Sequence, residues 1–122
     1  MKLMKIDSVT LPVKDHTKSA RWYADTLGLP EIWRMAEQKG VGFGLGDNSA
    51  TINLFEERDA PQILVQVERV DETRRELERR GIAFDGPTET IEGIGKLAGF
   101  RDPDGNRLAL LDYTIEHGET SS

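Results

Sequence analysis

Residues Leu97 to Asp112 read LAGFRDPDGNRLALLD, and this stretch decides the fold. Its middle, from Asp102 to Asn106, is dense in turn formers. Proline presets the φ of a turn, glycine accepts a positive φ, and Asp and Asn side chains bond nearby backbone groups. Apolar runs that suit β-strands lie on both sides of the turn. The stretch therefore predicts a β-hairpin with a loop of about four or five residues.

A second stretch has the same layout earlier in the chain. Residues Gly40 to Phe55 read GVGFGLGDNSATINLF, which is again two apolar runs around a polar turn. In the first run, Gly42 and Gly44 alternate with apolar residues, so one face of that strand is nearly bare backbone. Such a face suits close approach by another strand or by a ligand.

The two hairpins close two halves with one order of elements: strand, helix ended by glycine, strand, hairpin. In the first half we expect a strand over residues 4–13, a helix that opens at Asp15 and ends near residue 27, and a strand over 31–36. In the second half we expect a strand over 62–67, a helix over 71–80 that stops at Gly81, and a strand that begins at 82–84 and continues in extended form over 88–91. The first helix has a predicted buried stripe of Ala20, Tyr23, Ala24 and Leu27.

Corresponding positions in the two halves are separated by nearly constant offsets. Ser8 and Gln62 are 54 positions apart, and Asn53 and Ala109 are 56 positions apart. A single βαβββ unit cannot cover both faces of its own sheet. The repeat therefore predicts an α+β fold in which two such units form a curved mixed sheet around a groove, with the helices outside.

Composition limits the classes of function. A length of 122 residues suits one domain. The net charge of −6 argues against a grip on nucleic-acid phosphates or on an anionic membrane. The absence of cysteine excludes disulfides, thiolate metal sites and a thiol nucleophile. No apolar run approaches the length of a membrane span and no apolar leader opens the chain, so we expect a soluble cytoplasmic protein.

Three motifs in this chain resemble the vicinal oxygen chelate superfamily. They are residues 6–15 (IDSVTLPVKD), residues 19–29 with SARWY and LGL, and residues 100–106 (FRDPDGN). That superfamily includes glyoxalases, extradiol dioxygenases, fosfomycin-modifying enzymes and bleomycin-resistance proteins. The resemblance implies one domain over residues 1–122, with a first module at about 4–56, a second at about 62–113 and a tail at 114–122. It also implies a cup-shaped sheet, commonly completed by a symmetric homodimer.

The resemblance raises the question of a metal, because the enzymes of the family hold a divalent ion with one inward residue from each of four strands. It places those four ligand positions at Ser8, Asn53, Gln62 and Ala109. Their side chains are a hydroxyl, two amides and a methyl group. Sites for Zn, Fe, Mn or Ni need imidazole or anionic donors, and neutral oxygens compete poorly with water. We therefore expect no metal at these positions.

The rest of the chain offers few substitutes for the missing ligands. We expect His16 and His117 at the surface. Strand alternation places Glu56 on the face opposite Asn53 unless a bulge turns it inward, and the same objection applies to Asp7 beside Ser8. The chain carries no phosphate-binding glycine loop and no arrangement for a Ser-His-Asp triad, so catalytic residues stay unknown.

If the alternation holds, the inward side chains are apolar and aromatic with a few polar groups, as in a small-molecule pocket. Trp33 and Phe55 would stack a planar ring or a cation, or would pack in the core or in a dimer. Asn53 and Gln62 would bind a carbonyl or amide group, or would bond each other. The predicted ligand-binding residues are Ser8, Thr10, Trp33, Met35, Thr51, Asn53, Phe55, Gln62, Leu64 and Arg107, with Ala109 and Leu111 completing the lining. Arg107 would hold an anionic group or join a surface ion pair.

These observations favour a metal-free protein that binds a small, partly aromatic molecule in order to sequester, transport or sense it. One alternative is a divalent-metal-dependent lyase, isomerase or dioxygenase with displaced ligands such as Glu56, or a metal-free catalyst that uses a polar cup residue. Another is a scaffold whose cup is only a dimer interface. The expected partners are a small molecule and a second copy of the chain.

Overall fold

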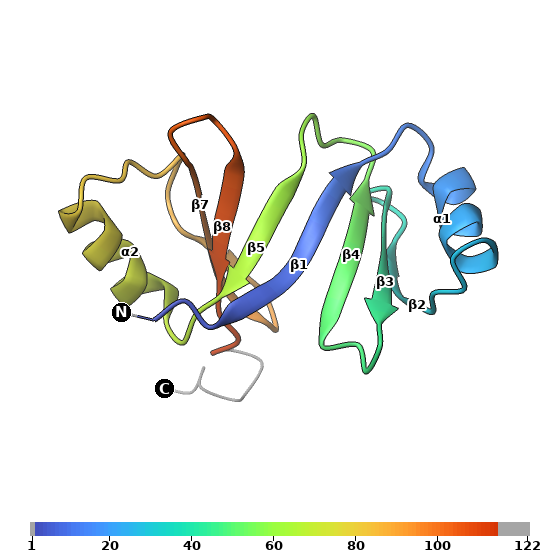
Figure 1. The fold of residues 1–122 in the computed structure, drawn as a ribbon, viewed down its shortest axis with the longest axis horizontal. Coiled ribbons are helices and arrows are strands. Elements are labelled where there is room, and N and C mark those ends of the chain that lie inside the picture. Colours follow the sequence, from blue (N-terminus) through green and yellow to red (C-terminus); the bar gives the residue numbers. More distant parts are fainter. Residues whose placement is uncertain (1, 115–122) are drawn as a thin grey trace. The chain divides into compact units, whose positions relative to one another are not determined.

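The computed structural model describes residues 2–114 and divides the chain into two compact units. The first unit comprises residues 7–63, and the second comprises the residues up to Ile6 together with those from Leu64 onward. The element order is βαβββ followed by βαβββ, which confirms the α+β class and the predicted repeat (Figure 1). The predicted tail from residue 115, including His117, lies outside the described residues.

The first unit is a four-stranded mixed sheet in the order β2-β3-β4-β1. Strands β2 (Glu31–Met35), β3 (Gly40–Leu45) and β4 (Ala50–Phe55) are antiparallel neighbours, and β1 (Lys5–Pro12) runs parallel to β4. One face packs on helix α1 (His16–Asp25) through a buried cluster of Ala20, Val41, Phe43 and Leu54. The Tyr23 ring stacks on Phe43 with 5.6 Å between ring centroids.

Helix α1 begins as the sequence predicts and ends earlier than predicted. Asp15 is the N-cap, and its carboxylate accepts hydrogen bonds from the backbone N–H groups of Thr17 and Lys18, both at 3.1 Å. The helix stops at Asp25, so Leu27 no longer follows the helical repeat and is 48% exposed. Ala24 is exposed as well, so the predicted stripe is wrong at these two residues and right at Ala20.

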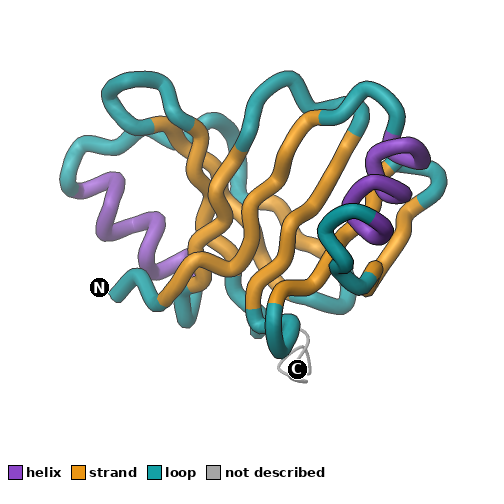
Figure 2. The backbone as a smooth tube through the Cα atoms, turned by 45° about the vertical axis from the view of Figure 1, so that its right-hand side comes forward, coloured by secondary structure: helices purple, strands orange, loops and turns teal. Residues whose placement is uncertain are grey.

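The second unit contains the strand order β5-β8-β7-β6. Its strands are β5 (Gln62–Gln66, whose first two residues belong to the first unit), β6 (Glu89–Ile91), β7 (Gly95–Arg101) and β8 (Arg107–Leu111). Figure 2 colours these strands orange and the helices purple. Helix α2 (Val70–Arg79) packs on this sheet through a core of Val67, Val70, Leu77, Ala98 and Leu110. The segment 82–84 is no strand: only Phe84 makes a single bridge, to Phe100.

Helix α2 ends at the predicted glycine. Gly81 adopts φ +99°, a value that favours glycine. Its N–H donates to the carbonyl of Glu78, and the N–H of Ile82 donates to that of Leu77, both at 3.0 Å. These two bonds form a Schellman motif, which satisfies the last helical carbonyls.

The turn between β7 and β8 forms as its residues predict. The Asp102 carboxylate accepts hydrogen bonds from the backbone N–H of Asp104 and Asn106 and from the Asn106 side chain, each at 2.9 Å. The side-chain bond from Asn106, followed by the backbone bonds, holds the pKa of Asp102 below its ordinary value. The turn thus fixes the hairpin that ends the second unit.

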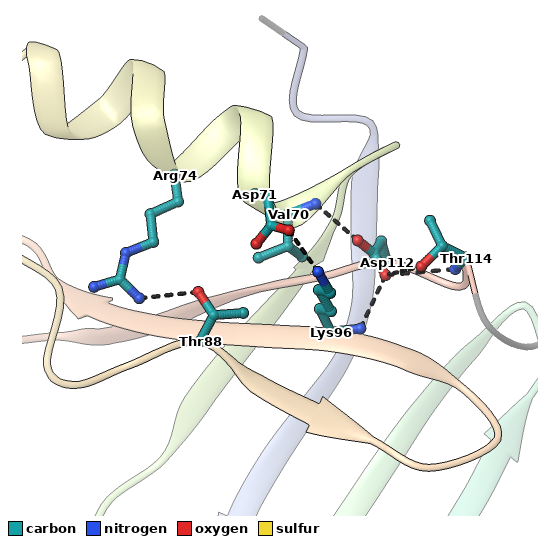
Figure 3. A network of polar contacts seen from close by, with 7 residues as sticks. All are labelled: Val70, Asp71, Arg74, Thr88, Lys96, Asp112 and Thr114. Carbon is teal, nitrogen blue, oxygen red and sulfur yellow. Dashed lines mark hydrogen bonds and ion pairs between the residues drawn. The ribbon is translucent and has the colours of Figure 1, made fainter. Parts of the chain in front are cut away.

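The start of α2 is held by a residue far away in the sequence. Asp112, which is 1% exposed, follows β8 and accepts a hydrogen bond from the Val70 N–H at 2.7 Å (Figure 3). The other oxygen of Asp112 accepts from the Lys96 N–H at 2.9 Å and from the Thr114 hydroxyl at 3.1 Å. The helix was predicted to open at Asp71 but begins at Val70, because this distant carboxylate takes the capping role.

Candidate functional site

Most of the predicted ligand-binding residues share one face of the first unit, the face opposite α1. In the strand register, Trp33 lies opposite Gly42, Gly42 opposite Asn53, and Asn53 beside Thr10. A neighbouring row joins Met35, Gly40 and Phe55, and a third joins Gly44, Thr51 and Ser8. Because paired residues in a sheet point to the same side, all of these side chains lie on one face, which we call the glycine face. It comprises Ser8, Thr10, Trp33, Met35, Gly40, Gly42, Gly44, Thr51, Asn53 and Phe55.

The bare backbone predicted for β3 is covered by the unit's own side chains. A Cβ atom added at Gly42 would overlap the Trp33 indole around Nε1, and one added at Gly40 would overlap the Phe55 ring. At Gly44 the overlap would be with the Asn48 side chain. The glycines therefore make room for the Phe55 and Trp33 rings and for the Asn48 side chain, which lie across the strand.

Trp33 and Phe55 form an aromatic pair on this face. Their ring centroids are 5.6 Å apart and their planes are tilted by 36°. Both residues are partly exposed, and Met35 beside them is 44% exposed. The pair consequently offers apolar ring surface to solvent, and such surface can stack on a planar molecule.

The polar side chains of the glycine face are arranged around Asn53. The Thr51 hydroxyl donates a hydrogen bond to Asn53 Oδ1 at 3.1 Å. Thr10 and Ser8 are each 2% exposed, and the Ser8 hydroxyl donates to the Asp7 carboxylate at 3.0 Å. Asn53 itself is only half-buried, so its amide can be reached from outside.

Gln62 is a buried amide with an unpaired atom. It is 9% exposed, and its Oε1 has no hydrogen-bond partner among residues 2–114. Asn53 Oδ1 already accepts from Thr51, so the two amides do not satisfy each other as one interpretation of the sequence had it. An unpaired buried acceptor costs about 1–3 kcal/mol of stability.

The other predicted lining residues belong to the second unit. Arg107, Ala109 and Leu111 alternate on β8 and share a face with Leu97 and Gly99 on β7, opposite the core residue Leu110. Ala109 and Leu111 are buried, whereas Arg107 and Leu64 are half-buried. Arg107 already takes part in an interaction within the chain.

The four ligand positions do not fit a divalent metal. Ser8 uses its hydroxyl hydrogen on Asp7, Asn53 Oδ1 accepts from Thr51, and Ala109 offers a methyl group. Gln62 contributes a neutral amide oxygen. None of these atoms supplies the charge or the imidazole nitrogen that offsets the desolvation of a Zn, Fe, Mn or Ni ion.

Sequence reasoning missed a cluster at the start of α1. Asp15, His16 and Glu56 offer ligand atoms within 4.8 Å of one another, the one such group of three among the described residues. Glu56 Oε2 lies 2.7 Å from His16 Nδ1 and accepts from the His16 backbone N–H at 2.8 Å. These two bonds hold the pKa of Glu56 below its ordinary value, and the bond to the His16 side chain has the larger effect.

The geometry of this cluster is that of a helix cap. The Asp15 carboxylate is engaged with two backbone N–H groups, and the positive end of the helix dipole opposes a cation. Glu56 points to α1 and not to the glycine face, in agreement with strand alternation. His16 was expected at the surface, but its side chain is only 17% exposed because it packs against Glu56. The signal that could have found this pair is an acidic residue directly after the last strand of each half.

Comparisons with known proteins agree on the fold. A profile described as the Glyoxalase/Bleomycin resistance protein/Dioxygenase superfamily matches residues 5–110. The uncharacterised protein YraH of Bacillus subtilis (strain 168) is 30% identical over 127 aligned residues, which cover 88% of this chain and 97% of YraH. Neither helix in the described part of the chain is long and apolar enough to cross a membrane.

Two solved structures have a similar fold at low sequence identity. Methylmalonyl-CoA epimerase from Mycobacterium tuberculosis has a TM-score of 0.79 and 16% identity, and the match covers 97% of this chain and 93% of that one. Homoprotocatechuate 2,3-dioxygenase from Brevibacterium fuscum has a TM-score of 0.74 and 17% identity, covering 99% of this chain and 37% of the dioxygenase. At such identities the likeness concerns the fold and leaves the activity open.

Proposed function

This chain belongs to the Glyoxalase/Bleomycin resistance protein/Dioxygenase superfamily, and on that premise we propose that it binds a small, partly aromatic molecule without a metal ion. The observation that carries the proposal is the glycine face, where the Trp33–Phe55 pair lies beside the Asn53 amide. An apolar ring surface with a few polar groups is the usual composition of a small-molecule site.

The metal-free part of the proposal rests on donor chemistry. In the family's metal-dependent members the ion needs anionic or imidazole ligands, and the four positions here hold a hydroxyl, two amides and a methyl group. Any carboxylate or imidazole recruited from the α1 cluster would have to give up its bonds to the helix start.

Binding without turnover is the role that this face supports best. The residues that make up the glycine face carry hydroxyl, amide, thioether and aromatic groups. The one carboxylate bonded to them in the described part of the chain, Asp7, is engaged with the Ser8 hydroxyl, and no imidazole lies among them for proton transfer. Sequestration, transport or sensing of a small molecule needs only affinity. The homodimer expected from the family resemblance is part of the proposal, and sedimentation of the purified protein tests it.

Tryptophan fluorescence provides the experiment. In a Trp22→Phe variant, Trp33 is the single tryptophan, and its emission reports the glycine face. We expect planar aromatic molecules to quench it saturably, and equally well after EDTA treatment and after addition of Zn²⁺, Mn²⁺ or Ni²⁺. In the matched control, Trp33→Phe, the remaining Trp22 on α1 should not respond. A response that requires one of these ions, or a stoichiometric ion in the purified protein, would instead favour a metal-dependent lyase, isomerase or dioxygenase.

A further inference from the structure

We propose that the molecule bound on the glycine face is uncharged and presents a carbonyl oxygen to the side-chain N–H groups of Asn53 and Trp33. This inference rests on the proposed binding function and names the chemical class of the ligand. Three features of the first unit support it: the orientation of the Asn53 amide, the position of the Trp33 indole, and the absence of positive charge among the side chains of the face.

The orientation of the Asn53 amide is fixed by its neighbour. The Thr51 hydroxyl donates to Asn53 Oδ1 at 3.1 Å, so the oxygen of the amide is engaged and the Nδ2 group is left as the donor. Among residues 2–114, Nδ2 donates no hydrogen bond. Asn53 is half-buried, and an approaching acceptor can therefore reach these two hydrogens.

The Trp33 indole adds a second donor in the same row of the sheet. Its Nε1 lies over Gly42, and Gly42 is the cross-strand partner of Asn53. Cross-strand partners on one face are about 4.5–5.5 Å apart at Cβ, so the indole N–H and the Asn53 amide are neighbours. An indole N–H is a donor only. Two adjacent donors call for a ligand atom with two lone pairs, and a carbonyl oxygen is such an atom.

The charge of the face selects a neutral acceptor over a carboxylate. The side chains that make up the glycine face are all uncharged, and the charge beside it, the Asp7 carboxylate that accepts from Ser8, is negative. The protein as a whole carries a net charge of −6. Removing a carboxylate from water is costly unless a cation pairs with it. A ketone, amide or quinone oxygen accepts the same hydrogen bonds at a much smaller desolvation cost.

The aromatic pair sets the shape of the rest of the molecule. Phe55 lies over Gly40, one row from the donors, and its ring is 5.6 Å from that of Trp33. Rings prefer offset or tilted contacts at centroid distances of about 4.5–7 Å. A planar ring system that carries the carbonyl group directly can therefore stack here while its oxygen meets the donors. The ligand class is an aryl ketone, an aryl amide or a related planar carbonyl compound.

Three naphthalenes of similar size test the inference: 2-acetylnaphthalene, 2-isopropylnaphthalene and 2-naphthoate. The first has a neutral carbonyl, the second has no acceptor and the third carries a negative charge. Each is titrated into the full-length protein, and binding is followed through the Trp33 indole signal in ¹H–¹⁵N spectra, assigned with the Trp22→Phe variant. We expect 2-acetylnaphthalene to bind roughly 3- to 10-fold more tightly than the other two, and the indole proton to shift downfield only with this probe.

Two substitutions at Asn53 separate the donor from the fold. Asn53→Asp keeps an acceptor for Thr51 but removes the two amide hydrogens, and Asn53→Leu keeps the volume without polarity. Both should remove the preference for 2-acetylnaphthalene and leave 2-isopropylnaphthalene within about twofold of its original affinity. Gln38→Glu adds the same charge at an exposed position of the same unit that is not part of the glycine face, and should preserve the preference.

The outcomes distinguish the two levels of the proposal. Equal affinities for the acetyl and isopropyl probes, or a preference for 2-naphthoate, would overturn the neutral-carbonyl inference and leave the binding function standing. Retention of the preference in both Asn53 variants would also overturn it. No response of Trp33 to any of the three probes would contradict the binding function and this inference together.

Discussion

In both units a carboxylate directly after the last strand accepts a hydrogen bond from the first residue of the helix, but the two carboxylates differ greatly in burial. In the first unit Glu56, directly after β4, accepts from the backbone N–H of His16 at 2.8 Å. In the second unit Asp112, directly after β8, accepts from the N–H of Val70 at 2.7 Å. His16 and Val70 are 54 positions apart and Glu56 and Asp112 are 56 apart, which are the offsets of the sequence repeat. The carboxylate and the first helical N–H therefore have the same arrangement in both units, although the residues that form it differ.

The difference lies in how many groups depend on each carboxylate. The Glu56 side chain is 21% exposed, and Asp15 shares the capping of α1. Asp112 is 1% exposed and also accepts from Lys96 and Thr114, while the N-cap of α2, Arg69, makes no side-chain capping bond. The comparison teaches that equivalent positions can carry unequal energetic weight, because burial decides what replaces a lost partner.

Removal of Asp112 should have the largest effect. Asp112→Ala leaves the buried N–H group of Val70 and the partly buried N–H group of Lys96 without an acceptor, and we expect the free energy of unfolding to fall by about 3 kcal/mol. Urea unfolding at neutral pH measures the loss. Asp112→Asn, which keeps one carbonyl oxygen, should lose less. If the free energy of unfolding of the alanine variant falls by less than about 1 kcal/mol, the large stabilising contribution assigned to this buried carboxylate would be contradicted.

Local signals made most of the fold predictable. The turn at Asp102–Asn106 is determined by its own side chains, and the helix stop at Gly81 by a single backbone conformation. The start of α2 was misplaced because its cap, Asp112, is 42 positions away from Val70. Short-range patterns cannot specify a contact over that distance, although the repeat offsets contained the clue.

Adding a methyl group at a packed glycine should have the next largest effect. A Cβ at Gly95 would overlap the backbone oxygen of Asp112, whereas one at Gly42 would overlap only the Trp33 side chain. We expect Gly95→Ala to cost about 2 kcal/mol and Gly42→Ala about 1 kcal/mol, since a side chain can move more easily than backbone. Thermal unfolding compares the two variants, and a change in Trp33 fluorescence should accompany Gly42→Ala alone. The reverse order of stability would contradict this reasoning.

The sequence predicted which side chains of the candidate site share a face, but it did not predict how those side chains pack on that face. Strand alternation correctly grouped Trp33, Asn53 and Phe55 on one face. It could not indicate that the rings lie over Gly40 and Gly42, because a side-chain rotamer depends on the neighbours that the fold supplies. The pairing of Thr51 with Asn53 was equally hidden, and the ligand-binding role of these residues stays a prediction.

Loss of the exposed N-cap in the first unit should have a smaller effect. Asp15→Ala removes the acceptor for the N–H groups of Thr17 and Lys18, which are exposed and can bond water instead. We expect a decrease of about 1 kcal/mol in the free energy of unfolding. Asp15→Asn, a good capping residue, is the matched control and should stay close to the parent protein. A loss as large as that of Asp112→Ala would show that exposure does not distinguish the two caps.

The charge of Glu56 should have the smallest effect, and pH reveals it. The hydrogen bond from the His16 side chain, followed by that from its backbone, holds the pKa of Glu56 below the ordinary value of 4.5. A carboxyl group whose pKa is lowered by folding stabilises the folded state above its unfolded pKa, and this contribution disappears as the pH falls through the folded value. Glu56→Gln should therefore be slightly less stable than the parent near neutral pH, and the difference should shrink as the pH falls below 4.5 and vanish once the Glu56 carboxyl is protonated in the folded protein. Urea unfolding of both proteins across this pH range measures the difference in stability.

Glu31, Glu76 and Asp102 also have lowered pKa values, but they remain in both proteins, so their contributions cancel from the difference. A difference that grows on acidification would contradict the role assigned to the Glu56 carboxylate at the start of α1.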